Sequence, residues 1–357
     1  MSHKENVYEY NWCGRLNQRD IAKLAGVSSA TVSRVINKDK KVSPKTAKKV
    51  LQVIKENGYV QNAMARNLRM ANTKTIGYLV PDIKNPFFIA MLSGFQEMCF
   101  KQGYDIIFEN AADDPEKEKK ALETLLRYRV AGLLAVFVDS DNEYIDVFRN
   151  MGIPVVMIDR KSTGVQKNDY LMIDNMGGVG QIVDYLVSLG HTDIAMIYGP
   201  QDLTPGVERL NGFRKAMEKN GVQVKEEYLI PGLFTEEGGY HAVQKLLQLK
   251  NRPTAMIGGN NLTTMGAYKA LVDYKVSIPE EVSLVGFDDF PFAAHLQPSI
   301  TVIKRPNTNM GRVAAELLME RISKGEEGKD IPPRSIVMPT QLCIRKSCIQ
   351  IENLKAE

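Results

Sequence analysis

Polar and aromatic side chains follow several short apolar runs in the sequence, close to the point where each run ends. They are Asn85, Phe87, Asp159, Arg209, Phe234, Asn260 and Asp288. Carboxylates, amides and arginine form bidentate hydrogen bonds with adjacent hydroxyls, and an aromatic ring packs against the apolar face of a sugar. These residue types therefore favour a binding site for a polyhydroxylated ring. The alternative is that the phenylalanines belong to the core and the aspartates to turns.

The runs that precede these residues alternate with amphipathic stretches from Thr75 onward. They read TIGYLV, YDIIFEN, AGLLAVF, PVVMI, DIAMIY, TAMIGG and VSLVGF, and helical patterns such as FFIAMLSGFQEMCFKQG follow them. This alternation predicts parallel βαβ units. A second set of units begins after Leu189, so we expect two α/β lobes. Ligands of such lobes bind beyond the carboxyl ends of the strands.

The N-terminal part of the chain has a different pattern, which predicts three short helices. Asn17, Ser28 and Ser43 are suitable N-cap residues for QRDIAKLA, SATVSRVIN and PKTAKKVLQVIKEN, and Gly26 ends the first helix. Each helix has one apolar face. In the first helix this face comprises Ile21, Leu24 and Ala25. The second helix buries its valines and offers small polar groups on its other side.

Positive charge is concentrated at the N-terminal end. Residues 1–75 hold 15 Lys and Arg against 5 Asp and Glu, a net charge of +10, so the remainder carries about −6 of the total of +4. A basic N-terminal module on a mildly acidic body indicates that the module faces a polyanion such as nucleic acid. The alternative is a basic surface that is merely solvated.

Several classes of protein are not indicated. The N-terminus has no apolar segment of a secretory signal, no run reaches the length of a membrane span, and the four cysteines have no paired spacing. We therefore expect a cytoplasmic protein with reduced thiols. The glycine-rich DNMGGVG matches no phosphate-binding loop, and no histidine has a partner for a catalytic triad. We expect no enzymatic activity, no cofactor and no metal site.

The chain resembles the lactose-repressor type (LacI/GalR) family of bacterial transcriptional regulators from about Asn17 to about Ile344. The N-terminal motifs are IAKLAGVSSATVSRVIN, KVSPKTAKKV, ENGY and ARNLR. The later ones are NPFF, IDR, DN, RLNGF, VGFDD and MGRVAAELL, in the expected order. There are two departures. Gln61 stands where members usually have proline, and Asn261 stands where they have an acid.

The resemblance implies an α/β protein with a small all-α helix-turn-helix headpiece and a hinge helix, followed by two doubly wound α/β lobes of periplasmic-binding-protein type. The expected segments are a tail (1–16), the headpiece (17–61), the hinge helix and linker (62–74), the core (75–345) and a C-terminal tail (346–357). Lobe 1 is expected at about 75–173 and 304–334, and lobe 2 at about 174–303 and 335–345.

The resemblance also implies the DNA-binding residues. The second helix enters the major groove, where Ser29, Ala30 and Arg34 occupy the positions that read bases. Three further residues are placed to contact phosphates, namely Thr31, Ser33 and Asn37. In the hinge helix, Leu68 is implied to insert between base steps of the minor groove, and Ala65 to allow the close approach of the two helices.

The function implied is that of a repressor that binds a pseudopalindromic operator in double-stranded DNA as a homodimer. A small-molecule effector, a sugar or sugar derivative, is expected between the lobes. It is expected to contact the seven polar and aromatic residues that follow the apolar runs, from Asn85 to Asp288. The alternative is a sugar-binding or sugar-processing protein that uses the same lobes. The absence of a signal sequence and the basic N-terminal module count against this alternative.

Overall fold

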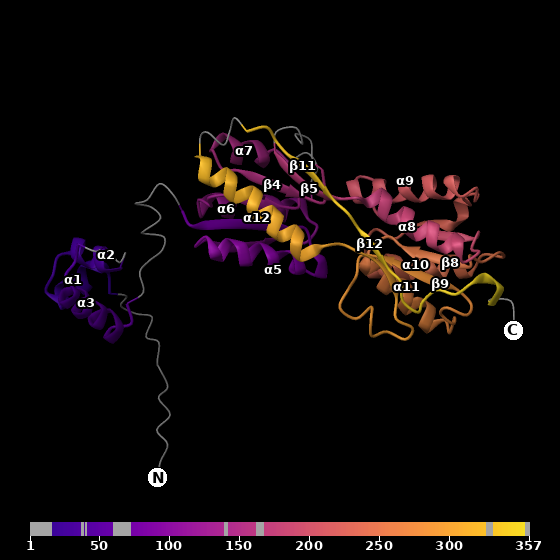
Figure 1. Ribbon diagram of the computed structural model, residues 1–357, viewed down its shortest axis with the longest axis horizontal. Coiled ribbons are helices and arrows are strands. Elements are labelled where there is room, and N and C mark those ends of the chain that lie inside the picture. Colours follow the sequence, from indigo (N-terminus) through magenta and orange to yellow (C-terminus); the bar gives the residue numbers. More distant parts are fainter. Residues whose placement is uncertain are drawn as a thin grey trace, which may run out of the picture. The chain divides into compact units, whose positions relative to one another are not determined.

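The computed structural model describes residues 16–36, 39, 41–59, 73–138, 142–161, 168–325 and 331–353. The chain divides into two compact units, the headpiece (residues 1–72) and the core (residues 73–357), both drawn in Figure 1. Among the described residues no helix is long and apolar enough to cross a membrane.

The headpiece contains three short helices. They are α1 (Gln18–Ala25), α2 (Ser29–Ile36) and α3 (Pro44–Glu56). The side chain of Asn17 accepts hydrogen bonds from the first turn of α1, and Asp20 reciprocates on the backbone of Asn17, which makes a capping box. Gly26 follows α1 in the left-handed conformation (φ 63°). Ser43 caps α3 ahead of the proline at its first position. The three predicted caps are confirmed.

Small apolar side chains hold the headpiece helices together. The buried ones are Ile21, Ala22, Ala25, Val32, Val35 and Val50. The prediction that Leu24 belongs to this face is wrong, because its side chain is 54% exposed. At 100° per residue the buried stripe of α1 is centred between Ala22 and Ala25, and Leu24 falls more than a quarter turn away from it.

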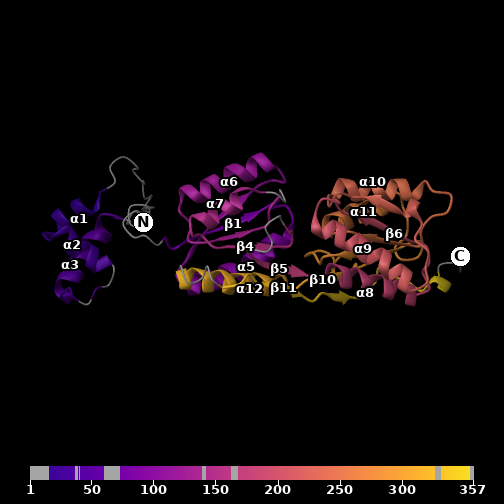
Figure 2. The same cartoon turned by 90° about the horizontal axis from the view of Figure 1, so that it is seen from above.

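Lobe 1 of the core is a parallel sheet in the order β11-β5-β4-β3-β1-β2. Its strands are β1 (Thr75–Val80), β2 (Asp105–Asn110), β3 (Leu133–Ala135), β4 (Val155–Ile158), β5 (Asp169–Ile173) and β11 (Ser335–Met338). Helices cover both faces of this sheet, as Figure 2 shows. One face carries α5 (Pro86–Lys101) and α12 (Asn307–Lys324), and the other carries α6 (Pro115–Arg127) and α7 (Tyr144–Asn150).

Lobe 2 repeats this plan in the order β12-β10-β9-β8-β6-β7. Its strands are β6 (Ile194–Tyr198), β7 (Leu229–Pro231), β8 (Ala255–Gly258), β9 (Ser283–Phe287), β10 (Thr301–Lys304) and β12 (Gln341–Cys343). One face carries α8 (Asn175–Ser188) and α9 (Thr204–Lys219), and the other α10 (Glu236–Leu247) and α11 (Asn261–Asp273). Short 3-10 turns occupy Glu226–Tyr228 and Ile351–Asn353. The edge strand β12 runs antiparallel to β10, which the sequence pattern did not predict.

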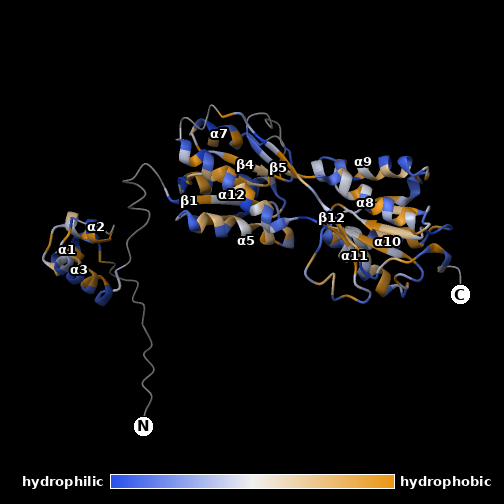
Figure 3. Cartoon of the chain, viewed as in Figure 1, coloured by the Kyte–Doolittle hydropathy of each residue, from blue (hydrophilic) through white to orange (hydrophobic). Residues whose placement is uncertain are grey.

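Apolar side chains fill the layers between sheets and helices, and Figure 3 shows the strands as predominantly hydrophobic. Helices α5 and α12 approach each other most closely at two glycines. A Cβ on Gly94 would lie 1.9 Å from the carbonyl oxygen of Thr308, and one on Gly311 would lie 2.0 Å from that of Met91. Only glycine fits at either position without moving the two helices apart.

The chain passes between the lobes three times, after β5, after β10 and after β11. The expected boundary before residue 335 is wrong, because β11 pairs with β5 and belongs to lobe 1. The apolar stretch from Ser335 to Cys343 divides into two strands of different sheets at Pro339, whose missing N–H and fixed φ interrupt the strand.

The segment after β12, expected to be a tail from residue 346, packs on lobe 2. The hydroxyl of Ser347 is buried, accepts a hydrogen bond from the backbone of Thr301 (2.8 Å) and donates one to the carbonyl of Leu284 (2.5 Å). Further along, the backbone N–H of Ile351 donates to the carbonyl of Leu189 (2.9 Å). Lobe 2 therefore extends at least to residue 351.

Candidate functional site

Helix α2 presents one exposed face. Val32 and Val35 are buried in the headpiece, whereas Ala30 and Arg34 are exposed and lie four residues apart on the opposite side of the helix. Ser29, Thr31 and Ser33 are half-buried at the margins of this face. The hydroxyl of Thr31 also lies 2.9 Å from that of the N-cap Ser28. The predicted DNA contacts Asn37, Ala65 and Leu68 lie outside the described residues.

The seven residues predicted to bind an effector are connected by contacts around the carboxyl ends of strands in both lobes, together with an eighth residue, Arg305. We call this set the lobe junction: Asn85, Phe87, Asp159, Arg209, Phe234, Asn260, Asp288 and Arg305. Asp159 directly follows β4 of lobe 1 and Asp288 directly follows β9 of lobe 2. The structure thus brings together residues that are far apart in the sequence.

Arg209 extends from α9 into the lobe junction and is 2% exposed. Its Nε donates to Asn175 (2.9 Å), and its Nη1 donates to the carbonyl of Gly259 (2.8 Å) and lies 3.7 Å from Asp288. Its guanidinium stacks 3.8 Å from the centre of the Phe287 ring and 5.4 Å from that of Phe234. Burial lowers the pKa of Arg209 to about 10, and Asp288 opposes that shift, so the side chain is charged at neutral pH.

Arg305 lies on the connection from β10 to α12 and is 4% exposed. Its Nη1 donates to Asp159 (2.8 Å) and its Nη2 to Asp288 (2.7 Å), while its Nε contacts the other oxygen of Asp288. The guanidinium lies 3.6 Å from the centre of the Phe87 ring. Two buried arginines, Arg209 and Arg305, therefore balance two buried aspartates.

Amide side chains complete the lobe junction. Asn85 caps α5 by accepting from the backbone of Phe87 (3.0 Å) and also accepts from Asn261 of lobe 2 (2.9 Å). Asn260 caps α11 by accepting from Thr263 (2.8 Å) and donates to the carbonyl of Phe234 (3.2 Å). The departure at Asn261 thus has a structural role, since an ionised aspartate has no N–H to donate to Asn85.

Backbone strain marks three residues of the lobe junction. Asp159, Phe234 and Asp288 have φ values of 65°, 58° and 73°, in the left-handed region that non-glycine residues seldom adopt. This conformation turns each side chain sharply at the end of a strand or at the start of a loop. Strained residues of this kind concentrate at ligand sites.

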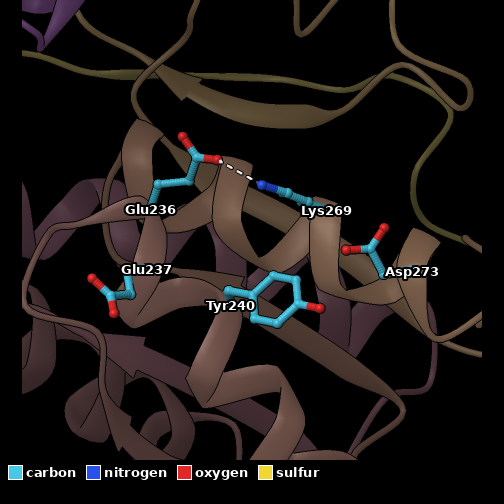
Figure 4. A pocket seen from close by; sticks show the side chains of 5 residues that line it. All are labelled: Glu236, Glu237, Tyr240, Lys269 and Asp273. Carbon is cyan, nitrogen blue, oxygen red and sulfur yellow. Dashed lines mark ion pairs between the residues drawn. The ribbon is translucent and has the colours of Figure 1, made fainter.

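An open hollow of about 490 Å³ lies elsewhere on lobe 2 and is shown in Figure 4. Residues of α10 and α11 line it, namely Glu236, Glu237, Tyr240, Lys269 and Asp273. Its one ion pair, between Glu236 and Lys269 (3.7 Å), joins side chains that are each more than half exposed. No residue of the lobe junction lines it, and an exposed ion pair of this kind contributes little to stability.

Arg305 is the one residue of the lobe junction that was not predicted from the sequence. The residue directly follows a strand, as Asp159 and Asp288 do, so the same positional rule applies to it. Its position was not recognised because the run TVIK, which forms β10 (Thr301–Lys304), was not among the apolar runs predicted to be strands. Asn175, which accepts a hydrogen bond from Arg209, belongs to the DN motif but was likewise not predicted to be a site residue.

Comparison with known proteins gives matches to both units. Residues 18–62 match the family described as bacterial regulatory proteins, lacI family, and residues 183–348 match the periplasmic binding protein-like domain. The chain is 36% identical over 307 residues to the ribose operon repressor of Escherichia coli (strain K12), which covers 86% of this chain and 93% of that repressor.

Two solved structures extend the likeness. The lac repressor dimer bound to operator and the anti-inducer ONPF matches with a TM-score of 0.80 and 25% identity, covering 94% of this chain and 100% of that one. A LacI family transcriptional regulator from Enterococcus faecium with bound ribose matches with a TM-score of 0.69 and 29% identity, covering 77% and 99%.

Headpiece and core together define a DNA-binding protein with a helix-turn-helix and a two-lobed, effector-binding α/β body. The chain belongs to the lacI family of bacterial regulatory proteins. Its matched relatives are transcriptional repressors, and it is likewise a DNA-binding repressor and not an enzyme.

Proposed function

We propose that the chain acts in the cytoplasm as a homodimer on a pseudopalindromic operator, and that a sugar or sugar derivative bound at the lobe junction controls its affinity for DNA. One observation carries the effector proposal. Asp159, Arg209 and Asp288 lie in a single buried contact network with Phe87 and Phe234. Carboxylates and guanidinium recognise adjacent hydroxyls, and the rings pack against C–H faces. The ribose in the similar Enterococcus regulator supports this class of ligand.

The effector class is tested by a thermal-shift screen of sugars, sugar phosphates and nucleobases on the full chain. A ligand at about 100 times its dissociation constant should stabilise the fold by about 2.7 kcal/mol. The hit is then added to operator-bound protein, where a change in DNA affinity is expected. Stabilisation by nucleobases and by no sugar would contradict the proposal.

For DNA binding we propose that Ser29, Ala30 and Arg34 of α2 read bases in the major groove. The exposed face formed by Ala30 and Arg34 supports this, because small neighbours let the helix approach the base edges. Thr31, Ser33 and Asn37 are proposed to contact phosphates. Ala65 and Leu68 are proposed, on the resemblance to the LacI/GalR family alone, to contact the minor groove. Through them, effector binding in the core would alter the affinity for DNA.

Replacing Arg34 by alanine is expected to remove about 1–3 kcal/mol of discrimination at one base pair of each half-site, since a bidentate contact to guanine would be lost. Binding to an operator series with single substitutions measures this. Arg19→Ala is the matched control, because Arg19 is an exposed arginine on α1. It should weaken operator and random duplex alike. Equal losses on both duplexes for Arg34→Ala would show that Arg34 does not read a base.

The proposed dimer places lobe 1 against lobe 1, with α12 and its neighbour α5 in the interface. Two exposed apolar side chains of α5, Ile89 (44%) and Phe100 (53%), support this assignment. We expect a dimer at micromolar concentration by sedimentation, and dissociation when both residues are replaced by glutamate. Val272→Glu on α11 is the control, since Val272 is similarly exposed (52%) but lies on lobe 2. A wild-type monomer would refute the proposal.

A further inference from the structure

Arg305 occupies contacts that the proposed effector would need. It binds Asp159 of lobe 1, Asp288 of lobe 2 and the face of Phe87, three of the seven residues proposed to hold a sugar. A guanidinium presents paired N–H groups to carboxylates and a flat face to an aromatic ring. A sugar ring with adjacent hydroxyls presents the same two features. Arg305 can therefore make the same kinds of contact in the lobe junction that a sugar ring would make.

Arg305 also joins the two lobes. Its connection leaves lobe 2 at β10 and enters lobe 1 at α12, and its guanidinium bonds a carboxylate of each lobe at 2.7–2.8 Å. Further hydrogen bonds join the lobes. Asn261 donates to Asn85 (2.9 Å), the backbone N–H of Lys161 donates to Thr204 (3.0 Å), and the ammonium of Lys161 donates to Glu208 (3.3 Å). The two lobes are thus in direct contact through these side chains.

The charges show what can replace Arg305. Asp159 and Asp288 are buried, with exposed fractions of 7% and 2%, and the positive charges of Arg209 and Arg305 balance them. Once Arg305 is displaced, one positive charge remains beside two carboxylates. An anionic ligand would add a third negative charge in a desolvated place, which is strongly unfavourable. An uncharged ring that donates hydrogen bonds to both carboxylates avoids this repulsion.

We propose that Arg305 is the specificity-determining residue of the lobe junction: it acts as an internal occupant that holds the lobes closed, and an effector must displace it, which restricts effectors to ring compounds with adjacent hydrogen-bond donors and no negative charge. This inference rests on the proposed function of the lobe junction. The effector binds only the fraction of molecules from which Arg305 has withdrawn, so the occupant lowers the apparent affinity of every effector.

The test compares wild type with Arg305→Gln in the full chain. The first readout needs no ligand: hydrogen exchange of the Lys161 amide, whose partner Thr204 lies on the other lobe. Exchange should be about tenfold faster in Arg305→Gln, because the lobes separate more often. Arg345→Gln is the matched control. Arg345 forms a two-point ion pair with Asp289 (2.8 and 3.0 Å), but within lobe 2, so its loss should leave the Lys161 amide unchanged.

The second readout is calorimetric titration with D-ribose and D-ribose 5-phosphate. D-ribose should bind Arg305→Gln about tenfold more tightly than wild type, and the phosphate should bind both proteins more weakly than D-ribose does. Should Arg305→Gln not fold, Arg305→Lys keeps the charge without the planar fork and should shift both readouts in the same direction.

An unchanged exchange rate of the Lys161 amide in Arg305→Gln would overturn the proposal. It would also be overturned if D-ribose bound Arg305→Gln no more tightly than wild type, or if D-ribose 5-phosphate bound wild type more tightly than D-ribose does. Weaker binding of D-ribose to Arg305→Gln, or tight binding of the phosphate to wild type, would make Arg305 a ligand-binding residue and not an occupant. The exchange readout separates this inference from the proposed function, since it requires no sugar, whereas the proposed function fails when no sugar alters operator binding.

Discussion

Replacing Arg209 by alanine is expected to abolish the response of operator binding to the effector while leaving effector-free DNA affinity nearly intact. The guanidinium lies between Phe287 and Phe234 and bonds Asn175 and Gly259, so its loss removes a contact surface for ligand from the lobe junction. It also leaves Asp288 with one positive neighbour fewer. Removing one partner of a buried ion pair costs about 3–5 kcal/mol of stability. The headpiece is a separate unit and keeps its own core.

The measurements are calorimetry with the sugar found in the screen and operator binding with and without that sugar. Arg214→Ala is the control on the same helix. Arg214 is a surface residue that pairs with Glu226 (2.6 Å), and its loss should not alter the response. Unchanged sugar affinity in Arg209→Ala would move the effector site away from the lobe junction.

The second large effect is expected from Gly311→Ala. The added Cβ would lie 2.0 Å from the carbonyl oxygen of Met91, so the backbones of α5 and α12 must move apart at this point. We expect the free energy of unfolding to fall by about 3 kcal/mol, at the upper end of the usual cost of overpacking. Urea denaturation followed by circular dichroism measures this change.

Gly180→Ala separates this steric effect from helix propensity. Gly180 lies inside α8, and a Cβ there meets no atom within 4 Å. Alanine at this position should stabilise the helix by up to about 1 kcal/mol. If Gly311→Ala were as stable as Gly180→Ala, the tight approach of α5 and α12 would not be required by the fold.

Local signals made much of the fold predictable. Asn17, Ser28 and Ser43 satisfy the free N–H groups of helix starts in their own neighbourhood, so their role is visible in a few residues of sequence. Buried parallel strands likewise read as apolar runs. The polar residues at the ends of those runs could be named, because parallel strands of one sheet all end at the same edge.

Arg305 shows why the remaining features of the fold and site could not be predicted from the sequence. Its partners Asp159 and Asp288 are 146 and 17 residues away, and nothing near Arg305 in the sequence indicates either of them. The pairing of β11 with β5 has the same origin. Each depends on which surface the folded chain places opposite, and a hydrophobicity pattern does not contain that information.

The position of β11 bears on the order in which the chain becomes folded during its synthesis. The edge of the lobe 1 sheet beside β5 is formed by Ser335–Met338, and α12 covers the same lobe, so most of the polypeptide must leave the ribosome before this sheet is complete. The fold of lobe 2 is likewise incomplete until β12 and Ser347 have been synthesised. The described headpiece residues (16–36, 39 and 41–59) form a core of their own, so they are able to fold before either lobe is complete. A nascent chain can therefore present a folded α2 while both lobes still have open sheet edges, and such edges are the natural targets of chaperones.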